Sequence, residues 1–137
     1  MSGEQDLRRL LAGLEPHLHP DLLVYASIDP GVPLPAVDAF AVIVEDEGTT
    51  LVLRAVDADA VELRPEYPCR RIELRVHSDL AAVGLTAAFA TALADHGISA
   101  NVVAGLHHDH LLVPVDDAER AMTVLQDLQR AASSVQP

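Results

Sequence analysis

The clearest pattern in the chain is a strict alternation of apolar and polar residues over residues 71–77. Ile72, Leu74 and Val76 share one face of this segment, which predicts a strand with one buried side. The opposite face carries charged residues and His77. The elements predicted for the second half of the chain leave that polar face uncovered.

The spacing of apolar residues changes to that of a helix directly after this strand. Between residues 80 and 97, leucine, phenylalanine and alanine recur at intervals of three and four, which predicts an amphipathic helix. We expect Ser78 or Asp79 to be its N-cap, because short polar side chains accept the first free backbone N–H groups of a helix. Gly97 is a typical stop signal.

Three further elements complete the second half. Residues 98–104 are rich in β-branched residues and lie between two glycines, which predicts a strand, and residues 110–115 predict another. Residues 116–132 have helical apolar spacing and acidic residues in the first turn. The order β-α-β-β-α predicts an α+β sandwich with two helices on one face of a small antiparallel sheet.

The first half of the chain predicts a reduced version of the same unit. A short amphipathic helix is expected at residues 7–14, and strands at residues 22–28, 40–44 and 50–56. Three prolines within residues 29–39 leave no room for a long helix between the first two of these strands.

The boundary between the two units is expected at Pro68. Residues 57–68 predict one helical turn followed by a linker. We therefore divide the chain into a reduced first unit, residues 1–67, and a second unit, residues 68–137.

Composition and charge limit the partners of the protein. The 137 residues contain 9 Lys+Arg and 21 Asp+Glu, a formal net charge of −12, and such a surface repels nucleic acid and anionic membranes. No segment has the length of a membrane span, and the first residues lack the pattern of a signal peptide. The single cysteine, Cys69, gives no sign of an oxidising compartment, so we expect a cytoplasmic protein.

Four stretches carry a resemblance to a known family: EDEGTTLVL, HSDLAAVGLTAA, GISANVVAG and HDHLLVPV. Through them the chain resembles small bacterial proteins built from tandem ACT domains, over about residues 22–128. It is also distantly similar to the eukaryotic cytosolic arginine sensor of that architecture. The resemblance implies a ferredoxin-like βαββαβ fold in two tandem units, the first reduced, and a regulatory protein that is not an enzyme and has no cofactor.

The resemblance also implies a ligand site. In ACT proteins an amino acid or related small metabolite binds between units, against the loop before the first helix and against the second strand. The matching positions here are Ser78, Asp79, Leu80, Val83, Gly84, Leu85, Asn101 and Val102. Backbone N–H groups at the start of the helix suit a carboxylate, and Asp79 or a neighbouring acid would hold an ammonium group. If the first unit cannot form its half of a site, binding requires a homodimer.

Each of these residues also has a purely structural interpretation. Asp79 serves as an N-cap, Gly84 as a close helix contact, and Asn101 as a hydrogen-bonded residue of an edge strand. The sequence leaves both interpretations open.

Four consecutive residues, His107, His108, Asp109 and His110, raise a separate hypothesis. In a strand His108 and His110 would share one face and the other two the opposite face, so the four cannot bind one ion. His108 and His110 with His77 would make a metal-dependent enzyme, which is one alternative. We favour a polar turn into a hairpin, in which the imidazoles and Asp109 bond to neighbouring backbone and face solvent or a subunit interface. An intermediate possibility is that His108 or His110 lines the ligand site or makes stability pH-dependent. A dimerisation module without a ligand is the other alternative.

Overall fold

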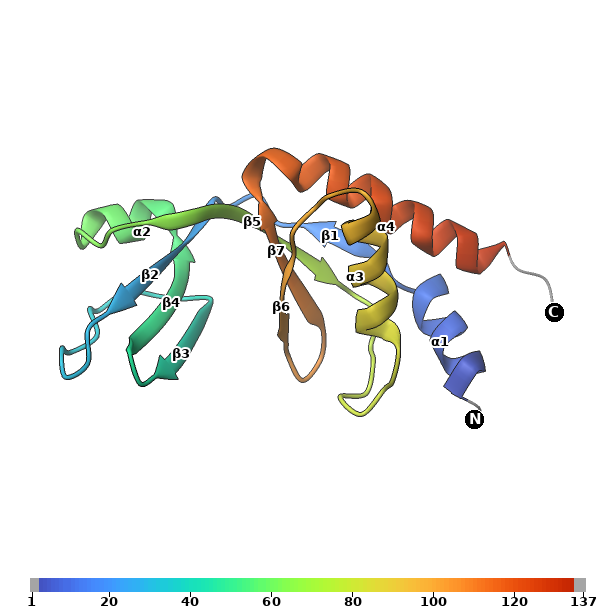
Figure 1. Ribbon diagram of the computed structural model, residues 1–137, viewed down its shortest axis with the longest axis horizontal. Coiled ribbons are helices and arrows are strands. Elements are labelled where there is room, and N and C mark those ends of the chain that lie inside the picture. The colour runs from blue at the N-terminus through green and yellow to red at the C-terminus, as the bar shows by residue number, and fades with distance from the viewer. Residues whose placement is uncertain (1–2, 135–137) are drawn as a thin grey trace.

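The computed structural model describes residues 3–134, with side chains from residue 7 onward. Its elements, shown in Figure 1, are α1 (Gly3–Ala12), β1 (Pro16–Leu18), β2 (Leu23–Ile28), β3 (Ala41–Glu45), β4 (Gly48–Arg54), α2 (Ala55–Ala60), β5 (Glu66–Leu74), α3 (Leu85–Asp95), β6 (Asn101–Ala104), β7 (Asp109–Pro114), the 3-10 turn η1 (Val115–Asp117) and α4 (Ala118–Ser133). No helix within residues 3–134 is long and apolar enough to cross a membrane.

All seven strands belong to one antiparallel sheet in the order β3-β4-β2-β5-β7-β6, and β1 pairs separately with β5. The first part of β5 pairs with β2, and the part from Cys69 to Leu74 pairs with β7. Where β5 pairs with β2, it has an extra residue between Glu66 and Cys69, and Tyr67 takes a left-handed conformation there with φ 51°. The expected linker is therefore shorter, and the proposed division at Pro68 falls inside a strand that both units share.

The two units have the predicted ferredoxin-like arrangement. In the second unit β5, α3, β6, β7 and α4 follow in order, and β1 pairs with β5 as the fourth strand. In the first unit β2, β3, β4 and α2 follow in order, and the beginning of β5 is the fourth strand. As predicted from its prolines, the connection from β2 to β3 contains no helix.

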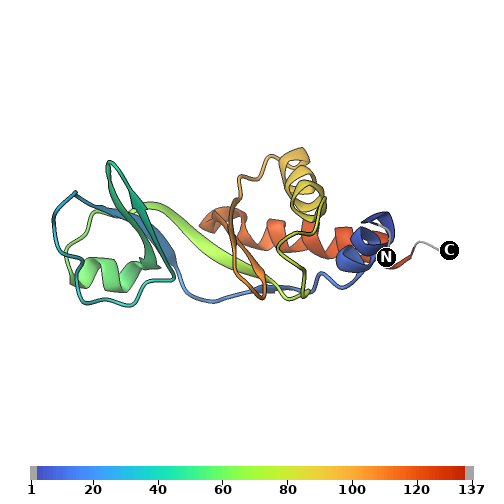
Figure 2. The same cartoon turned by 90° about the horizontal axis from the view of Figure 1, so that it is seen from below.

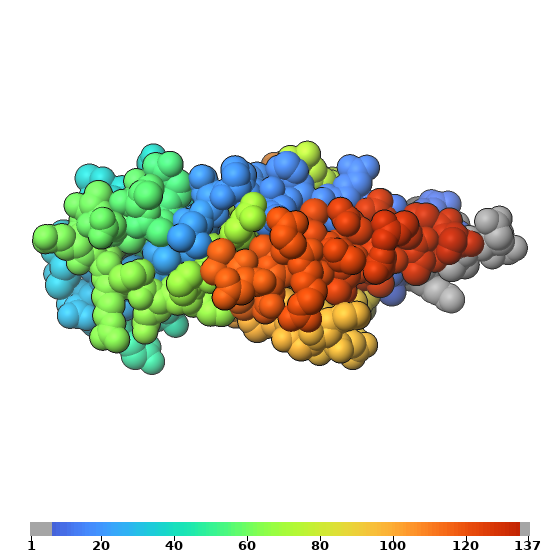
Figure 3. Space-filling model, turned by 90° about the horizontal axis from the view of Figure 1, so that it is seen from above, coloured from blue at the N-terminus to red at the C-terminus, as the bar shows by residue number. Residues whose placement is uncertain are grey.

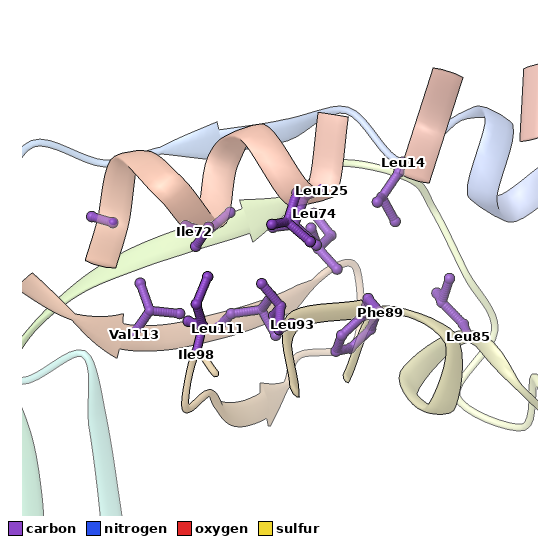
Figure 4. Packing of buried hydrophobic residues seen from close by; sticks show 13 residues of the cluster. Leu14, Ile72, Leu74, Leu85, Phe89, Leu93, Ile98, Leu111, Val113 and Leu125 are labelled. Atoms are coloured by element: carbon purple, nitrogen blue, oxygen red, sulfur yellow. The ribbon is translucent and has the colours of Figure 1, made fainter. Parts of the chain in front are cut away.

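The largest hydrophobic core lies in the second unit, between its sheet and its helices (Figure 4). Ile72 and Leu74 of β5 pack there against Phe89 and Leu93 of α3, as their spacing predicts. Leu14, which is completely buried, comes from the N-terminal segment. Helix α1 and strand β1 therefore pack with the second unit, although they are distant from it in the sequence.

The molecule is elongated, with α1, α3 and α4 towards one end and the short α2 at the other (Figure 2). Helix α4 lies along the surface of the second unit, and the first unit extends beyond it (Figure 3). On the sheet face away from the helices a smaller cluster contains Leu23, Val52, Cys69 and Leu112. This cluster joins residues of both units, so the first unit partly covers the face that the second unit leaves open.

The prediction that Ser78 or Asp79 caps a helix at Leu80 is wrong. Asp79 instead closes a turn: its side chain accepts a hydrogen bond from the backbone N–H of Ala81 at 2.7 Å, and its carbonyl accepts one from Ala82 at 2.9 Å. Helix α3 begins six residues later, after Gly84, whose φ of +99° turns the chain into the helix.

Candidate ligand-binding site

The loop before α3, which the resemblance implies as a ligand site, lies at the surface. Leu80 is 64% exposed and Val83 86%. No described side chain forms a cap hydrogen bond at the start of α3. The first backbone N–H groups of the helix therefore remain able to bind a carboxylate, at a position displaced from the predicted one.

The other predicted residues of this site do not join Leu80 and Val83 on the exposed surface of the loop. Leu85 is buried in the core, and Gly84 faces the side chain of Leu7 on α1, only 3.2 Å from the place of an added Cβ. Asn101 and Val102 are exposed on the edge strand β6. They follow the far end of α3, which at 11 residues is about 16 Å long. A single copy of the chain does not bring the predicted set together.

The histidines do not gather into a metal site. His77 and His107 have ring centroids 6.1 Å apart, but His110 lies with Arg71 and Phe40. Among residues 3–134 no three His, Cys, Asp or Glu side chains are placed to hold a metal ion. The arrangement gives no support to the metal-dependent enzyme.

His110 and its neighbour His108 differ in their surroundings. Burial and then the charge of Arg71 lower the pKa of His110. Its Nδ1 lies 3.0 Å from Arg71 Nη1 and accepts that hydrogen bond, because a guanidinium can only donate. His108 has a buried Nδ1 with no hydrogen-bond partner in the described structure. The predicted sharing of one strand face does not hold, because β7 begins only at Asp109.

A pocket that the sequence did not predict lies where the two units meet. Its volume is about 240 Å³. The apolar part of its wall is formed by Leu23, Ala39 and Phe40. The charged and polar part comes from the β1–β2 connection, the segment before β3, the end of β4, α2 and β5, through His19, Asp21, Asp38, Arg54, Asp57 and Arg71.

Arg71 is held in place on the floor of this junction pocket. Its guanidinium lies over the Phe40 ring, 4.7 Å from the centroid, and its side chain is only 21% exposed. Burial lowers the pKa of Arg71, and the carboxylates of Glu73 and Asp21 partly oppose this effect. The arrangement orients a planar cation, of the kind that binds carboxylates.

Sequence reasoning missed the junction pocket because its residues come from separate segments. The only signal was that Arg71 lies on the polar face of a predicted strand. Asp21 and Asp38 each precede a strand by two or three residues. They approach Arg71 only because β2 pairs with both β4 and β5, and that pairing order cannot be read from spacing.

Comparisons with known proteins agree with the fold. Two models of the ACT domain match the chain, over residues 2–70 and residues 66–127. The two matches overlap within β5, the strand that both units share. A search of curated proteins finds no significant match.

Several solved structures resemble the chain. A protein of unknown function from Vibrio cholerae, described as a possible transport protein, is 40% identical, with a TM-score of 0.83, covering 93% of this chain and 99% of that one. A protein from Agrobacterium tumefaciens is 18% identical, with a TM-score of 0.72 and coverage of 83% and 87%. The regulatory subunit of aspartate kinase from Thermus flavus is 12% identical, with a TM-score of 0.58 and coverage of 82% and 95%.

The last two likenesses show a common fold. Together with the two domain matches and the 40% identical relative, they identify the architecture of a small protein built from two tandem units. The chain belongs to the ACT-domain family.

Proposed function

We propose that this protein is a non-enzymatic regulator that binds an amino acid or related small metabolite at its ACT units, as a cytoplasmic homodimer. ACT domains are regulatory domains that bind small molecules, typically amino acids, and often dimerise. The regulatory subunit of aspartate kinase shares the fold. The similarity to the eukaryotic arginine sensor stays a prediction.

The observation that carries the proposal is the uncapped start of α3 beside an exposed loop. Free helix N–H groups bind anions, and the apolar side chains of Leu80 and Val83 in the preceding loop are 64% and 86% exposed in the described structure. A carboxylate at the helix start, with its apolar part against these side chains, would complete the surface. Because Asn101 is remote within one copy, we assign its part in the site to a second copy.

The mechanism we propose is a population shift. The ligand would favour the arrangement of units or subunits that closes over it, and so change a contact with a partner. A ligand acts in this way only through its different affinity for the two arrangements.

A thermal-shift screen against the twenty amino acids tests the proposal. A ligand at 100 times its Kd stabilises the folded state by about 2.7 kcal/mol, which raises the melting temperature measurably. The variants Ser78→Ala and Asp79→Ala are expected to weaken the response without loss of folding, because both residues lie in the loop. A flat response to all twenty at millimolar concentration would contradict the proposal.

A dimerisation module without a ligand remains the second candidate, favoured by the edge strand β3. Val42, Ile43 and Val44 on this strand are 50%, 45% and 82% exposed. An exposed apolar edge can pair with another chain. Such a module would dimerise unchanged in the Ser78 and Asp79 variants and show no ligand response.

A further inference from the structure

The junction pocket is lined by charged groups that do not belong to the loop before α3. It shares no residue with that loop. Its wall joins both units, and Arg71 lies on β5, the strand that both units use. A molecule bound there would contact both units at once.

The guanidinium of Arg71 in the pocket wall suits a carboxylate. The polar contacts of Arg71 within residues 3–134, to His110 at 3.0 Å and to Glu73 at 3.6 Å, both use Nη1. Its Nη2 and Nε therefore remain for a bidentate carboxylate. Glu73 does not neutralise Arg71 fully, because it also contacts His19 at 3.1 Å and Arg75 at 3.3 Å.

Two exposed carboxylates of the pocket wall, Asp21 and Asp38, suit cations, although the charge of Asp21 also acts on Arg71 and both act on Arg54. Arg54 and Asp57 neutralise each other through two hydrogen bonds, of 2.9 and 3.2 Å. Asp21 and Asp38 are exposed, and neither forms an ion pair in the described part of the chain. Once the internal pair is set aside, the pocket offers two carboxylates, one guanidinium and the imidazole of His19, which already contacts Glu73.

A ligand that matches these charges has one carboxylate and two cationic groups. We propose that the junction pocket binds a small amino acid with a basic side chain, its carboxylate on Arg71 and its two cationic groups facing Asp21 and Asp38. The aliphatic part of such a ligand fits the wall of Leu23 and Phe40. The volume of about 240 Å³ is below that of pockets for drug-sized ligands and fits a small metabolite.

This inference rests on the proposed function, since it names the ligand class and the site for the same regulatory protein. Three probes test the carboxylate and the two ammonium groups of the ligand separately. L-ornithine carries all three groups, L-norvaline lacks the side-chain ammonium, and butane-1,4-diamine lacks the carboxylate. Calorimetric titration of the full chain is expected to give a Kd for L-ornithine at least about tenfold lower than for either of the others. Equal Kd values for L-ornithine and L-norvaline would overturn the inference.

Variants of the exposed carboxylates locate the site without endangering the fold. Asp21→Asn and Asp38→Asn are each expected to weaken L-ornithine binding about tenfold or more, through loss of a charge-assisted contact. Asp46→Asn, in the turn between β3 and β4, is the matched control and should bind as the natural chain does. Unchanged binding in both pocket variants would overturn the inference.

The loop variants separate this inference from the proposed function. If an amino acid binds, and Ser78→Ala or Asp79→Ala weakens it while Asp21→Asn and Asp38→Asn do not, the pocket is not the site and the proposed function stands. If the pocket variants weaken binding and the loop variants do not, the inference is supported. Failure of every amino acid to bind would remove both.

Discussion

The two ACT units share a strand and a strand order but differ in the helices that cover them. The second unit packs three helices around thirteen buried residues of the described chain, whereas the first unit has the six-residue α2 and a cluster of six. A core of that size gives little stability by itself. The strand pattern therefore specifies the topology. The number and length of the helices determine how much each unit contributes to the free energy of unfolding.

The largest effect is expected at Leu14, through which the N-terminal segment packs into the core of the second unit. A substitution there tests whether this segment belongs to the second unit. Leu14 is completely buried, so Leu14→Ala is expected to lower the free energy of unfolding by about 2–5 kcal/mol. Chemical denaturation measures the loss. Leu106→Ala, at a residue that is 70% exposed, is the control and should stay within about 0.5 kcal/mol. A loss for Leu14→Ala as small as that of the control would show that the N-terminal segment does not belong to the second unit.

The equivalent change in the first unit is Leu51→Ala on β4. Leu51 is 2% exposed, but we expect a loss of about 2–3 kcal/mol, at the lower end, because the segment without a helix between β2 and β3 can close over the space. Native-state hydrogen exchange should show faster exchange in β2 and β4 than in β7. Equal acceleration in all three strands would mean that the units unfold together.

The sequence predicted the strands and helices better than their partners. Alternation around Ile72 and Leu74, and helical spacing around Phe89, placed the core of the second unit correctly, because these patterns are local. The pairing of Pro16 with Leu74 joins residues far apart in the chain, so the N-terminal segment was assigned to the wrong neighbours. Local spacing carries no information on such pairs.

The prediction of site residues was limited for the same reason, because local sequence does not show which partners a residue contacts. The start of α3 was misplaced because Asp79 satisfies a turn of its own, and N-cap preference does not distinguish the two uses of an aspartate. The junction pocket was missed because it requires the strand order. Its residue Arg71 was predicted only as one of several charged residues on the polar face of a strand.

The contact between the two units can be tested at Tyr67, which lies at the irregular position of β5. Its hydroxyl and that of Ser99 lie 2.8 Å apart, and its ring packs on the Tyr25 ring at 5.6 Å. Tyr67→Phe removes the hydrogen bond and keeps the ring, with an expected loss of about 1 kcal/mol. In a double-mutant cycle Ser99→Ala should add almost nothing to Tyr67→Phe, whereas additive losses would show that the two hydroxyls do not interact.

The smallest effect is expected from a comparison of Glu73 with Glu66, which lie in the two halves of β5. Glu73, in the second-unit half, has a side chain that is 16% exposed beside His19, Arg75 and Arg71. Burial would raise the pKa of Glu73, but the hydrogen bonds from His19 and Arg75 and the charges of His19 and His108 outweigh it, and the pKa is lowered from 4.5. Glu66, in the first-unit half, is exposed and provides the control.

Because the pKa of Glu73 is lower in the folded than in the unfolded state, its stabilising effect is present above pH 4.5 and is lost as the pH falls through the folded-state value. Glu73→Gln should therefore lower the free energy of unfolding by about 0.5–1 kcal/mol at pH 7, the range of a partly exposed ion pair, and by almost nothing at pH 3. Glu66→Gln should change stability little at either pH. Urea denaturation of both variants at the two pH values measures this, and a loss for Glu73→Gln that persists at pH 3 would mean that packing, not charge, holds this side chain on the shared strand.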